Sequence, residues 1–236
     1  MPTGSELAYP VHETFYSVQG EGLHQGRAAF FIRLYGCPQG CWWCDSAGTW
    51  HPDYRPERVR LLRAAELAEL AAGQSPPEAL VVLTGGEPIL FDLDPLCAAL
   101  RRLGRLVHLE TSGMAALRGQ VDWVTLSPKP QGTWPLPEVV ARADEVKLIV
   151  HDSEDIQAGL ATLDGLSASA PIFLNPEWSR MRDGDRALLA YMVEAVKHNP
   201  RLRLGLQAHK FYQADLLDPA SVKDLVPLGG NPELGY

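Results

Sequence analysis

Three cysteines crowd into the eight residues 37–44, at a C-x3-C-x2-C spacing. The chain has 236 residues and four cysteines, so this stretch holds all of them except Cys97. Three thiolates can hold three irons of a 4Fe-4S cluster and leave the fourth iron open to a small molecule, whereas simple electron carriers usually use four thiolates. The spacing therefore favours a catalytic iron–sulfur site over plain electron carriage.

Two other interpretations of these cysteines are open at this point. A structural zinc site usually takes four ligands, and no C-x2-C or H-x3-H partner follows at a suitable distance. Two disulfides are possible by count, but cysteines this close in a chain without a secretory signal pattern indicate a metal. Cys97 lies in an apolar helical pattern over residues 94–100 and is predicted to be a buried core thiol.

Composition and charge argue against several classes of protein. The net charge of −8 disfavours a general nucleic-acid binder, because phosphate contacts need clustered Lys and Arg. No apolar run of about 18 residues occurs, so no membrane span is expected. We expect one domain over residues 1–236, with about residues 211–236 as a C-terminal extension. A cytoplasmic enzyme is expected, since a reducing compartment suits an oxygen-sensitive cluster.

The pattern of predicted elements indicates the fold class. Residues 1–12 are expected to be a loose lead-in, and residues 57–72 read as a helix. Strand and helix then alternate six or seven times, which is typical of a parallel α/β sheet with right-handed crossovers. A full barrel of eight β/α units would need about 250 residues. We therefore predict an incomplete, TIM-like barrel of about six parallel strands.

Polar clusters follow the ends of the predicted strands. They are the cysteine loop and residues 84–86, 110–112, 127–129, 175–178 and 207–209. In a parallel barrel or sheet the C-terminal ends of the strands share one face, and that face carries the active site. The sequence therefore predicts that these clusters line a single site.

Two features near the N-terminus have both a structural and a functional interpretation. Gly20-Glu21-Gly22 is either a plain hairpin turn or a turn whose backbone approaches a ligand closely. Arg33 lies inside an apolar strand over residues 28–35, where a charge is costly unless it is paired. Its partner could be a substrate carboxylate or a nearby Glu.

The cysteine spacing resembles the C-x3-C-x-Φ-C signature of the radical S-adenosylmethionine (SAM) enzymes, with Trp43 at the aromatic position. Motifs from residue 13 to about residue 210 resemble, more narrowly, the 7-carboxy-7-deazaguanine synthase family. They are FYSVQGEG at 15–22, FIR at 31–33, CDS at 44–46, TGGEP at 84–88, ETSG at 110–113, SPK at 127–129, DEVK at 144–147 and LQAHK at 206–210. The first and last of these are the most specific.

The resemblance implies an activity and its cofactors. The family converts 6-carboxy-5,6,7,8-tetrahydropterin to 7-carboxy-7-deazaguanine with loss of ammonia, in the biosynthesis of queuosine and other 7-deazapurines. The implied cofactors are a 4Fe-4S cluster, SAM and Mg²⁺, and SAM cleavage would give a 5′-deoxyadenosyl radical that takes a hydrogen from carbon 6 of the pterin. The implied partners are an electron donor such as flavodoxin and a second copy of the chain in a homodimer.

The resemblance also implies a role for each matching residue. The cluster ligands would be Cys37, Cys41 and Cys44. The SAM-binding residues would be Trp43, Gly86, Ser127, Pro128, Lys129, Asn175, Pro176, Glu177 and Trp178. The pterin-binding residues would be Val18, Gln19, Gly20, Arg33, Thr84 and His209. Ser46 would ligate magnesium where the family usually has Thr, and Asn175 stands where the family commonly has Gln.

Two rival functions explain part of the same sequence. An activating enzyme for a glycyl-radical protein is also a short radical SAM chain, but its substrate is a protein. The turn at residues 19–22, Arg33 and His209 favour a small anionic substrate instead. A non-catalytic iron–sulfur or zinc module would explain the cysteines but not the polar clusters at the other strand ends.

Overall fold

The computed structural model describes residues 7–214 of the chain. Within these residues nine strands form a single sheet, in the order β3-β1-β2-β4-β5-β6-β7-β8-β9. The strands are β1 (Ala8–Val18), β2 (Ala28–Leu34), β3 (Arg60–Arg63), β4 (Leu80–Gly85), β5 (Val107–Thr111), β6 (Trp123–Leu126), β7 (Glu145–Val150), β8 (Ile172–Pro176) and β9 (Leu202–Leu204). The strands from β2 to β9 along the sheet run parallel, whereas β1 is antiparallel to both β2 and β3.

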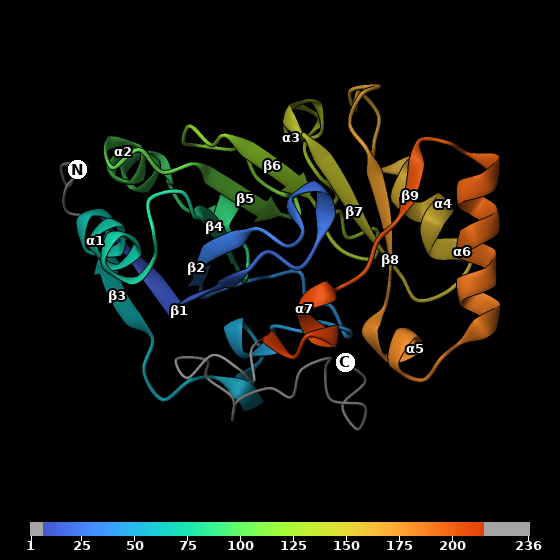
Figure 1. Ribbon diagram of the computed structural model, residues 1–236, viewed down its shortest axis with the longest axis horizontal. Helices are drawn as coiled ribbons and strands as arrows, with labels where there is room; N and C mark the ends of the chain where they lie inside the picture. The colour runs from blue at the N-terminus through green and yellow to red at the C-terminus, as the bar shows by residue number, and fades with distance from the viewer. Residues whose placement is uncertain (1–6, 215–236) are drawn as a thin grey trace.

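The longer helices lie around the outside of the curved sheet (Figure 1). The helices are α1 (Ala64–Gln74), α2 (Asp94–Arg102), α3 (Pro137–Arg142), α4 (Glu154–Ala161), α5 (Trp178–Arg182), α6 (Arg186–His198) and α7 (Ala208–Phe211). The short helix α7 lies beside the β1–β2 hairpin instead, where its first backbone N–H donates to Gly20 O at 2.9 Å. No helix within residues 7–214 has the length and apolar character needed to cross a membrane.

Side-chain alternation along the strands separates the core from the inner face. In β2, Ile32 is fully buried in the cluster that packs β1, β2, β4 and β5 against α1 and α2. Its neighbours Phe31 and Arg33 point to the opposite, inner face, because successive strand residues alternate. A second apolar cluster packs β6 to β8 against α3, α4 and α6, with Leu148 and Leu174 at its centre. Each fully buried side chain of this size contributes about 1.5–3 kcal/mol.

The open, mostly parallel α/β sheet confirms the predicted fold class, with seven parallel strands in the described chain rather than about six. Two local predictions were wrong. The lead-in over residues 1–12 already contains the start of β1 at Ala8, and the helix predicted over residues 57–72 begins only at Ala64. Its first residues form β3, because they pair with β1 in the register Ala8↔Arg63.

Candidate active site

A cavity of about 570 Å³ opens at the C-terminal ends of the parallel strands. All six predicted polar clusters contribute to its lining, as the geometry of parallel strands requires. The predicted site residues that line it are Val18, Gln19, Gly20, Arg33, Cys37, Cys41, Trp43, Cys44, Ser46, Thr84, Gly86, Ser127, Lys129, Pro176, Glu177, Trp178 and His209. Pro128 and Asn175 are buried outside this lining.

The cysteine loop presents three partly buried thiols to the cavity. Burial raises the pKa of Cys37 to about 11 and also raises the pKa of Cys41 and Cys44. Bound iron would reverse this shift, because a metal stabilises the thiolate that coordinates it. Within residues 7–214 no three His, Cys, Asp or Glu side chains converge on one ion, as a structural zinc site needs. A 4Fe-4S cluster places a separate iron at each thiolate, so the donor set fits it.

The cysteine loop packs directly on the turn after β4. Gly86 N donates to Leu34 O at 2.9 Å, and Glu87 N donates to Gly36 O at 2.8 Å. A Cβ at Gly86 would lie 2.2 Å from Gly36 O, so a side chain at this position would collide with backbone. Gly85 adopts φ +126°, which disfavours any residue with a Cβ. The two glycines therefore allow the backbone of the two loops to touch.

Glu87 joins the ends of β4 and β5 beneath the cavity. Its carboxylate is 2% exposed and accepts from Thr111 Oγ1 at 2.5 Å, from Ser112 N at 2.8 Å and from the Ser112 hydroxyl. Gln39 of the cysteine loop reaches the same place, where its Nε2 donates to Ser112 Oγ at 3.0 Å. These bonds fix the cysteine loop relative to two strand ends.

The SAM-side candidates Ser127 and Lys129 form a compact turn after β6. Lys129 Nζ donates to Ser127 O at 2.6 Å and to Ser127 Oγ at 2.7 Å. The same ammonium lies 5.3 Å from the centre of the Trp43 ring. Burial lowers the pKa of Lys129, and the nearby Cys41 opposes that shift. A cation held over an aromatic ring beside the cysteines suits recognition of an anionic group.

Arg33 has the structural partner that its sequence position left open. Its Nε donates to Glu13 Oε1 at 2.8 Å, and its guanidinium carbon lies 5.5 Å from the Phe15 ring centre. Both Arg33 and Glu13 line the cavity. The guanidinium has five N–H donors, so the single bond to Glu13 leaves others for a ligand carboxylate.

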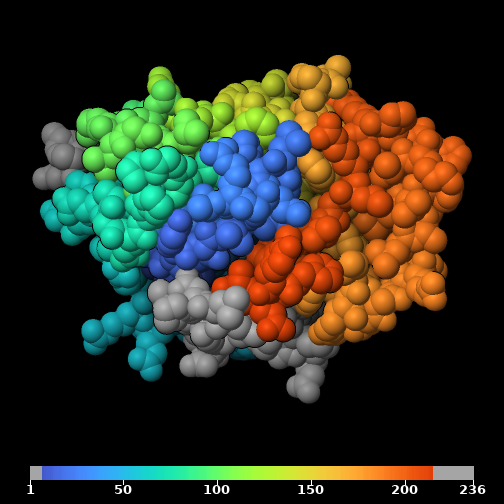
Figure 2. All heavy atoms as spheres, in the orientation of Figure 1, coloured from blue at the N-terminus to red at the C-terminus, as the bar shows by residue number. Residues whose placement is uncertain are grey.

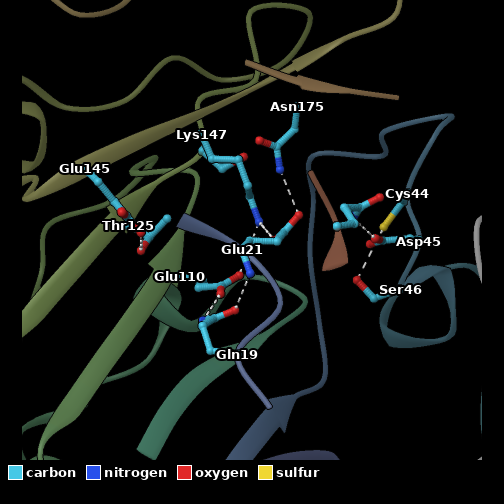
Figure 3. Close-up of polar contacts among 12 residues, drawn as sticks. Gln19, Glu21, Cys44, Asp45, Ser46, Glu110, Thr125, Glu145, Lys147 and Asn175 are labelled. Carbon is cyan, nitrogen blue, oxygen red and sulfur yellow. Dashed lines mark hydrogen bonds and ion pairs between the residues drawn. The ribbon is translucent and has the colours of Figure 1, made fainter. Parts of the chain in front are cut away.

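Lys147 stands between two carboxylates on the inner face of the sheet (Figure 3). Its Nζ donates to Glu21 Oε2 and lies 3.4 Å from Glu110 Oε2. Burial alone would lower the pKa of Lys147, but Glu110 and Glu21 outweigh it and raise that pKa. Burial likewise opposes ionisation of Glu110, and Lys147 together with the Gln19 amide holds its pKa below the usual range. Lys147 and Glu110 are therefore both charged in the folded protein.

Asn175 also contacts the group formed by Lys147, Glu21 and Glu110. Its Nδ2 donates to Glu21 Oε1 at 3.0 Å, and the residue is 1% exposed. Gln19 completes the arrangement, since its Nε2 donates to Glu110 Oε1 at 3.0 Å and its Oε1 accepts from Glu21 N at 3.1 Å. The structure thus places the Asn175 side chain beside the predicted pterin-binding loop.

The end of the described chain closes one wall of the cavity. Figure 2 shows the segment around β9 and α7 packed beside the β1–β2 hairpin. His209 lies so close to the hairpin that a Cβ at Gly20 would be 2.0 Å from its Nδ1. Burial lowers the pKa of His209, although Glu21 and Asp45 oppose that shift. His209 is therefore a neutral hydrogen-bonding group near neutral pH.

Asp45 ties the same C-terminal segment to the cysteine loop. Gln207 Nε2 donates to one carboxylate oxygen, Asp45 Oδ2, at 2.9 Å, and Lys210 Nζ lies 3.2 Å from it. The Lys210 ammonium also lies 5.0 Å from the centre of the Trp178 ring. Partial loss of hydration opposes ionisation of Asp45, whose side chain is 42% exposed, but Lys210 and the Gln207 amide lower its pKa well below the usual range. This ion pair links the loop after Cys44 to the wall that carries His209.

The comparisons with known proteins agree with this geometry. The model of the radical SAM superfamily matches residues 31–128. The chain is 40% identical over 207 residues to the 7-carboxy-7-deazaguanine synthase of Synechocystis sp., an alignment that covers 87% of this chain and 93% of that protein. The chain belongs to the 7-carboxy-7-deazaguanine synthase family. The family resemblance seen in the sequence motifs is therefore confirmed.

Other members of the 7-carboxy-7-deazaguanine synthase family support the same placement. The enzyme of Prochlorococcus marinus is 36% identical over 226 residues, covering 86% of this chain and 96% of that protein. The crystal structure of QueE from Escherichia coli matches with a TM-score of 0.71 at 33% identity, covering 86% of this chain and 96% of that chain. Radical SAM membership implies a 4Fe-4S cluster and SAM as cofactors.

Several charged lining residues were given no individual role from the sequence. They are Glu13, Glu21, Asp45, Glu87, Glu110, Lys147 and Lys210. All of them except Glu13 lie inside the family motifs, and Lys147 also carries the same signal as Arg33, a charge within an apolar strand. That signal marks a buried charge, which needs a partner, but it does not say which one.

Proposed function

We propose that this protein is a radical SAM lyase that converts 6-carboxy-5,6,7,8-tetrahydropterin to 7-carboxy-7-deazaguanine with loss of ammonia, in queuosine and 7-deazapurine biosynthesis. Family membership supports the reaction. The observation that carries the proposal is the shared cavity, because the cluster cysteines and the candidate pterin-binding residues line the same space. A glycyl-radical activating enzyme must instead admit a segment of a partner protein.

The residues of the SAM half would bind and orient the cofactor. Cys37, Cys41 and Cys44 would hold the cluster, and the bound cluster with SAM would supply the radical that removes hydrogen from the substrate. The SAM contacts that the family resemblance implies are Trp43, Gly86, Ser127, Pro128, Lys129, Asn175, Pro176, Glu177 and Trp178. Burial beneath the strand ends would exclude water from that reaction.

The residues of the pterin half would orient the substrate. Arg33 would pair with the pterin carboxylate while it keeps its bond to Glu13, because a guanidinium can serve two carboxylates. Val18, Gln19, Gly20, Thr84 and His209 would complete the pocket. All of these residues line the cavity, which supports the assignment.

The proposal also includes a magnesium ion, with Ser46 as its protein ligand. Its Oγ lies 3.7 Å from Cys44 Sγ, and the residue lines the cavity. Mg²⁺ is commonly bound through one or two protein oxygens, with substrate and water completing its shell. A single hydroxyl ligand is therefore sufficient if the substrate carboxylate supplies another, and the ion would orient that carboxylate.

The proposal extends to partners and organisation. We infer an electron donor such as flavodoxin, a homodimer, a cytoplasmic location suited to an oxygen-sensitive cluster, and a single radical SAM domain over residues 1–236. The predicted extension over about residues 211–236 lies mostly outside the described residues, which end at residue 214. We infer one of two roles for residues 216–236, covering the site or contacting a partner subunit. Unchanged activity and oligomeric state after their deletion would remove both.

A turnover assay tests the proposal directly. Anaerobically reconstituted protein is given SAM, Mg²⁺, a strong reductant and 6-carboxytetrahydropterin, and 7-carboxy-7-deazaguanine and 5′-deoxyadenosine are measured together. We expect product from the wild type and none from Cys41→Ala. Cys97→Ala is the matched control, because this thiol is buried in the core away from the cavity.

The failed outcomes of this assay point to different rivals. SAM cleavage without the deazaguanine would move the assignment to another radical SAM substrate, with the activating enzyme tested next. A colourless protein with tightly bound zinc and no SAM cleavage would favour the non-catalytic module.

A further inference from the structure

Glu21 lies in the β1–β2 connection, and two side chains from distant strands hold its carboxylate (Figure 3). Lys147 of β7 donates to Oε2, and Asn175 of β8 donates to Oε1 at 3.0 Å. These partners lie 126 and 154 positions from Glu21 along the chain. Since each carboxylate oxygen has its own donor, the direction of the side chain is fixed.

The orientation of the Asn175 amide follows from Glu21. An ionised carboxylate only accepts hydrogen bonds, so Nδ2 must face it and Oδ1 must point away. Oδ1 is buried without a hydrogen-bond partner among the described residues. A Cβ at Gly205 would lie 1.8 Å from Oδ1, so the absence of a side chain at Gly205 makes room for this orientation. An unpaired buried carbonyl is costly, and the charged bond to Glu21 offsets that cost.

Hydrogen bonds also connect the backbone of Glu21 to its neighbour Gln19 and, through Gln19, to Glu110. Glu21 N donates to Gln19 Oε1 at 3.1 Å, and Gln19 Nε2 donates to Glu110 Oε1 at 3.0 Å. Glu110 Oε2 lies 3.4 Å from Lys147 Nζ, which closes a ring of contacts back to Glu21. Gln19, a member of this ring, and its neighbour Gly20 both line the cavity. Their position is therefore set by groups on β5, β7 and β8.

We propose that Lys147 and Asn175 are positioning residues for the pterin: they fix Glu21, and through it they set Gln19 and Gly20 against the substrate. This inference rests on the proposed function. It assigns Asn175 to the pterin side of the cavity rather than to SAM. The inference predicts that both side chains control the KM for the pterin and leave SAM binding unchanged.

Steady-state kinetics separate the two assignments of Asn175. We expect Asn175→Ala to raise the KM for the pterin about tenfold, the equivalent of roughly 1.4 kcal/mol, with kcat and the KM for SAM within about twofold. Asn175→Asp should raise it further, because two carboxylates would face each other. Adding Glu21→Gln to Asn175→Asp should restore part of the loss, since the new amide can donate to the new carboxylate.

Hydrogen exchange tests the hold on the turn without any turnover. Amides of residues 19–26 should exchange faster in Asn175→Ala and in Lys147→Met than in the wild type, since the turn loses an anchor. Asn199→Ala is the matched control. Asn199 is the C-cap residue of α6 and does not line the cavity, and its side-chain Oδ1 accepts from Arg201 N at 3.2 Å. It should change neither the exchange of residues 19–26 nor the KM for the pterin.

Two results would overturn the inference. One is unchanged exchange over residues 19–26 in both variants. The other is a raised KM for SAM with an unchanged KM for the pterin in Asn175→Ala, which would return Asn175 to the SAM side. Absence of the deazaguanine product from the wild type would count against the proposed function instead, and the exchange data would then decide whether Lys147 and Asn175 hold the turn.

Discussion

At the scale of single residues, a close contact can require glycine at a position whether or not that residue also touches a ligand. Gly86 touches the carbonyl of Gly36, so its lack of a side chain serves packing between two loops as well as any contact with SAM. Gly20 likewise leaves room for a neighbour, because a Cβ there would lie 2.0 Å from His209 Nδ1. A glycine in a family motif therefore does not by itself identify a ligand contact.

Gly86→Ala should destabilise the fold around the cysteines. A Cβ placed 2.2 Å from Gly36 O must push two backbones apart, which we expect to lower the free energy of unfolding by about 1–3 kcal/mol. Chemical denaturation measures this effect. Gly73→Ala in α1 is the control, because a Cβ there meets nothing within 4 Å and should leave stability equal or higher. Equal stability of the two variants would contradict the packing role.

Glu87→Gln should also destabilise the protein, for a different reason. One carboxylate oxygen accepts from Ile89 N and the other from Ser112 N, so an amide turned either way would point its NH2 group at a backbone N–H. We expect a loss of about 1–3 kcal/mol in the free energy of unfolding. Glu194→Gln on the exposed side of α6 should be nearly neutral in the same denaturation experiment. A neutral Glu87→Gln would show that these bonds contribute little.

The sequence could not show which side chains of the site contact one another. The motifs predicted which strand ends meet, and the structure brings all six clusters to one cavity. The sequence left the partner of Arg33 open between a substrate and a Glu, and the structure shows Glu13. Neither Lys147 nor Asn175 could be linked to Glu21 in advance, because contacts across 126 and 154 positions leave no local pattern.

At the scale of elements, the turn that connects β1 and β2 packs against the inner face of the sheet. His24 of the connecting turn packs edge-on against Trp123 and against His108 of β5, with ring centres 4.6 and 4.5 Å away. Burial, helped by His24 and Arg27, lowers the pKa of His108 from 6.5 to about 4. The turn that carries Gln19 and Gly20 therefore packs, through His24, on the neutral imidazole of His108.

Stability should therefore fall in acid. Because the folded pKa of His108 is depressed, the unfolded chain takes up the proton first, and stability present above about pH 6.5 is lost as pH falls toward about 4. The largest loss from this residue is about 3 kcal/mol. Denaturation at about pH 7 and about pH 4.5 should show a smaller drop for His108→Gln than for the wild type. The exposed His198→Gln should show the wild-type drop, and an identical drop in all three would contradict the prediction.

The first strands show why the antiparallel edge of the sheet was missed. The sequence predicted the parallel repeat correctly, since apolar strands followed by helices have a strong local pattern. The first residues of β1 were taken for part of a lead-in because β1 is only partly buried and mixed in polarity. Residues 60–63 read as helix because their strand character depends on pairing with β1, a tertiary contact that overrides local propensity.

At the scale of the whole molecule, the three cysteines of the loop lie outside the apolar core of the fold. The two large apolar clusters lie between the sheet and the outer helices and include none of the three loop cysteines. The loop is joined to the rest mainly by polar bonds, such as those from Gln39 and Asp45. Folding of the sheet should therefore not depend on the cluster, although a bound cluster adds stability by mass action.

Iron removal tests this separation of core and loop. Protein stripped of iron by a chelator should keep its far-ultraviolet circular dichroism but melt several degrees below the reconstituted protein. The variant in which Cys37, Cys41 and Cys44 are all serine should melt at the same temperature before and after the same treatment. Loss of secondary structure on iron removal would show that the cluster is needed for the fold itself.

The contact between Gly20 and Ala208 has a consequence for the order of events during synthesis. The cavity wall at the hairpin is completed by a segment about 190 positions later in the chain, and closing so long a loop is slow. The cysteines leave the ribosome long before that segment does. They can therefore meet iron while the cavity is still open on one side. A nascent chain that stops before Ala208 would carry every cluster ligand and still lack the wall that holds His209.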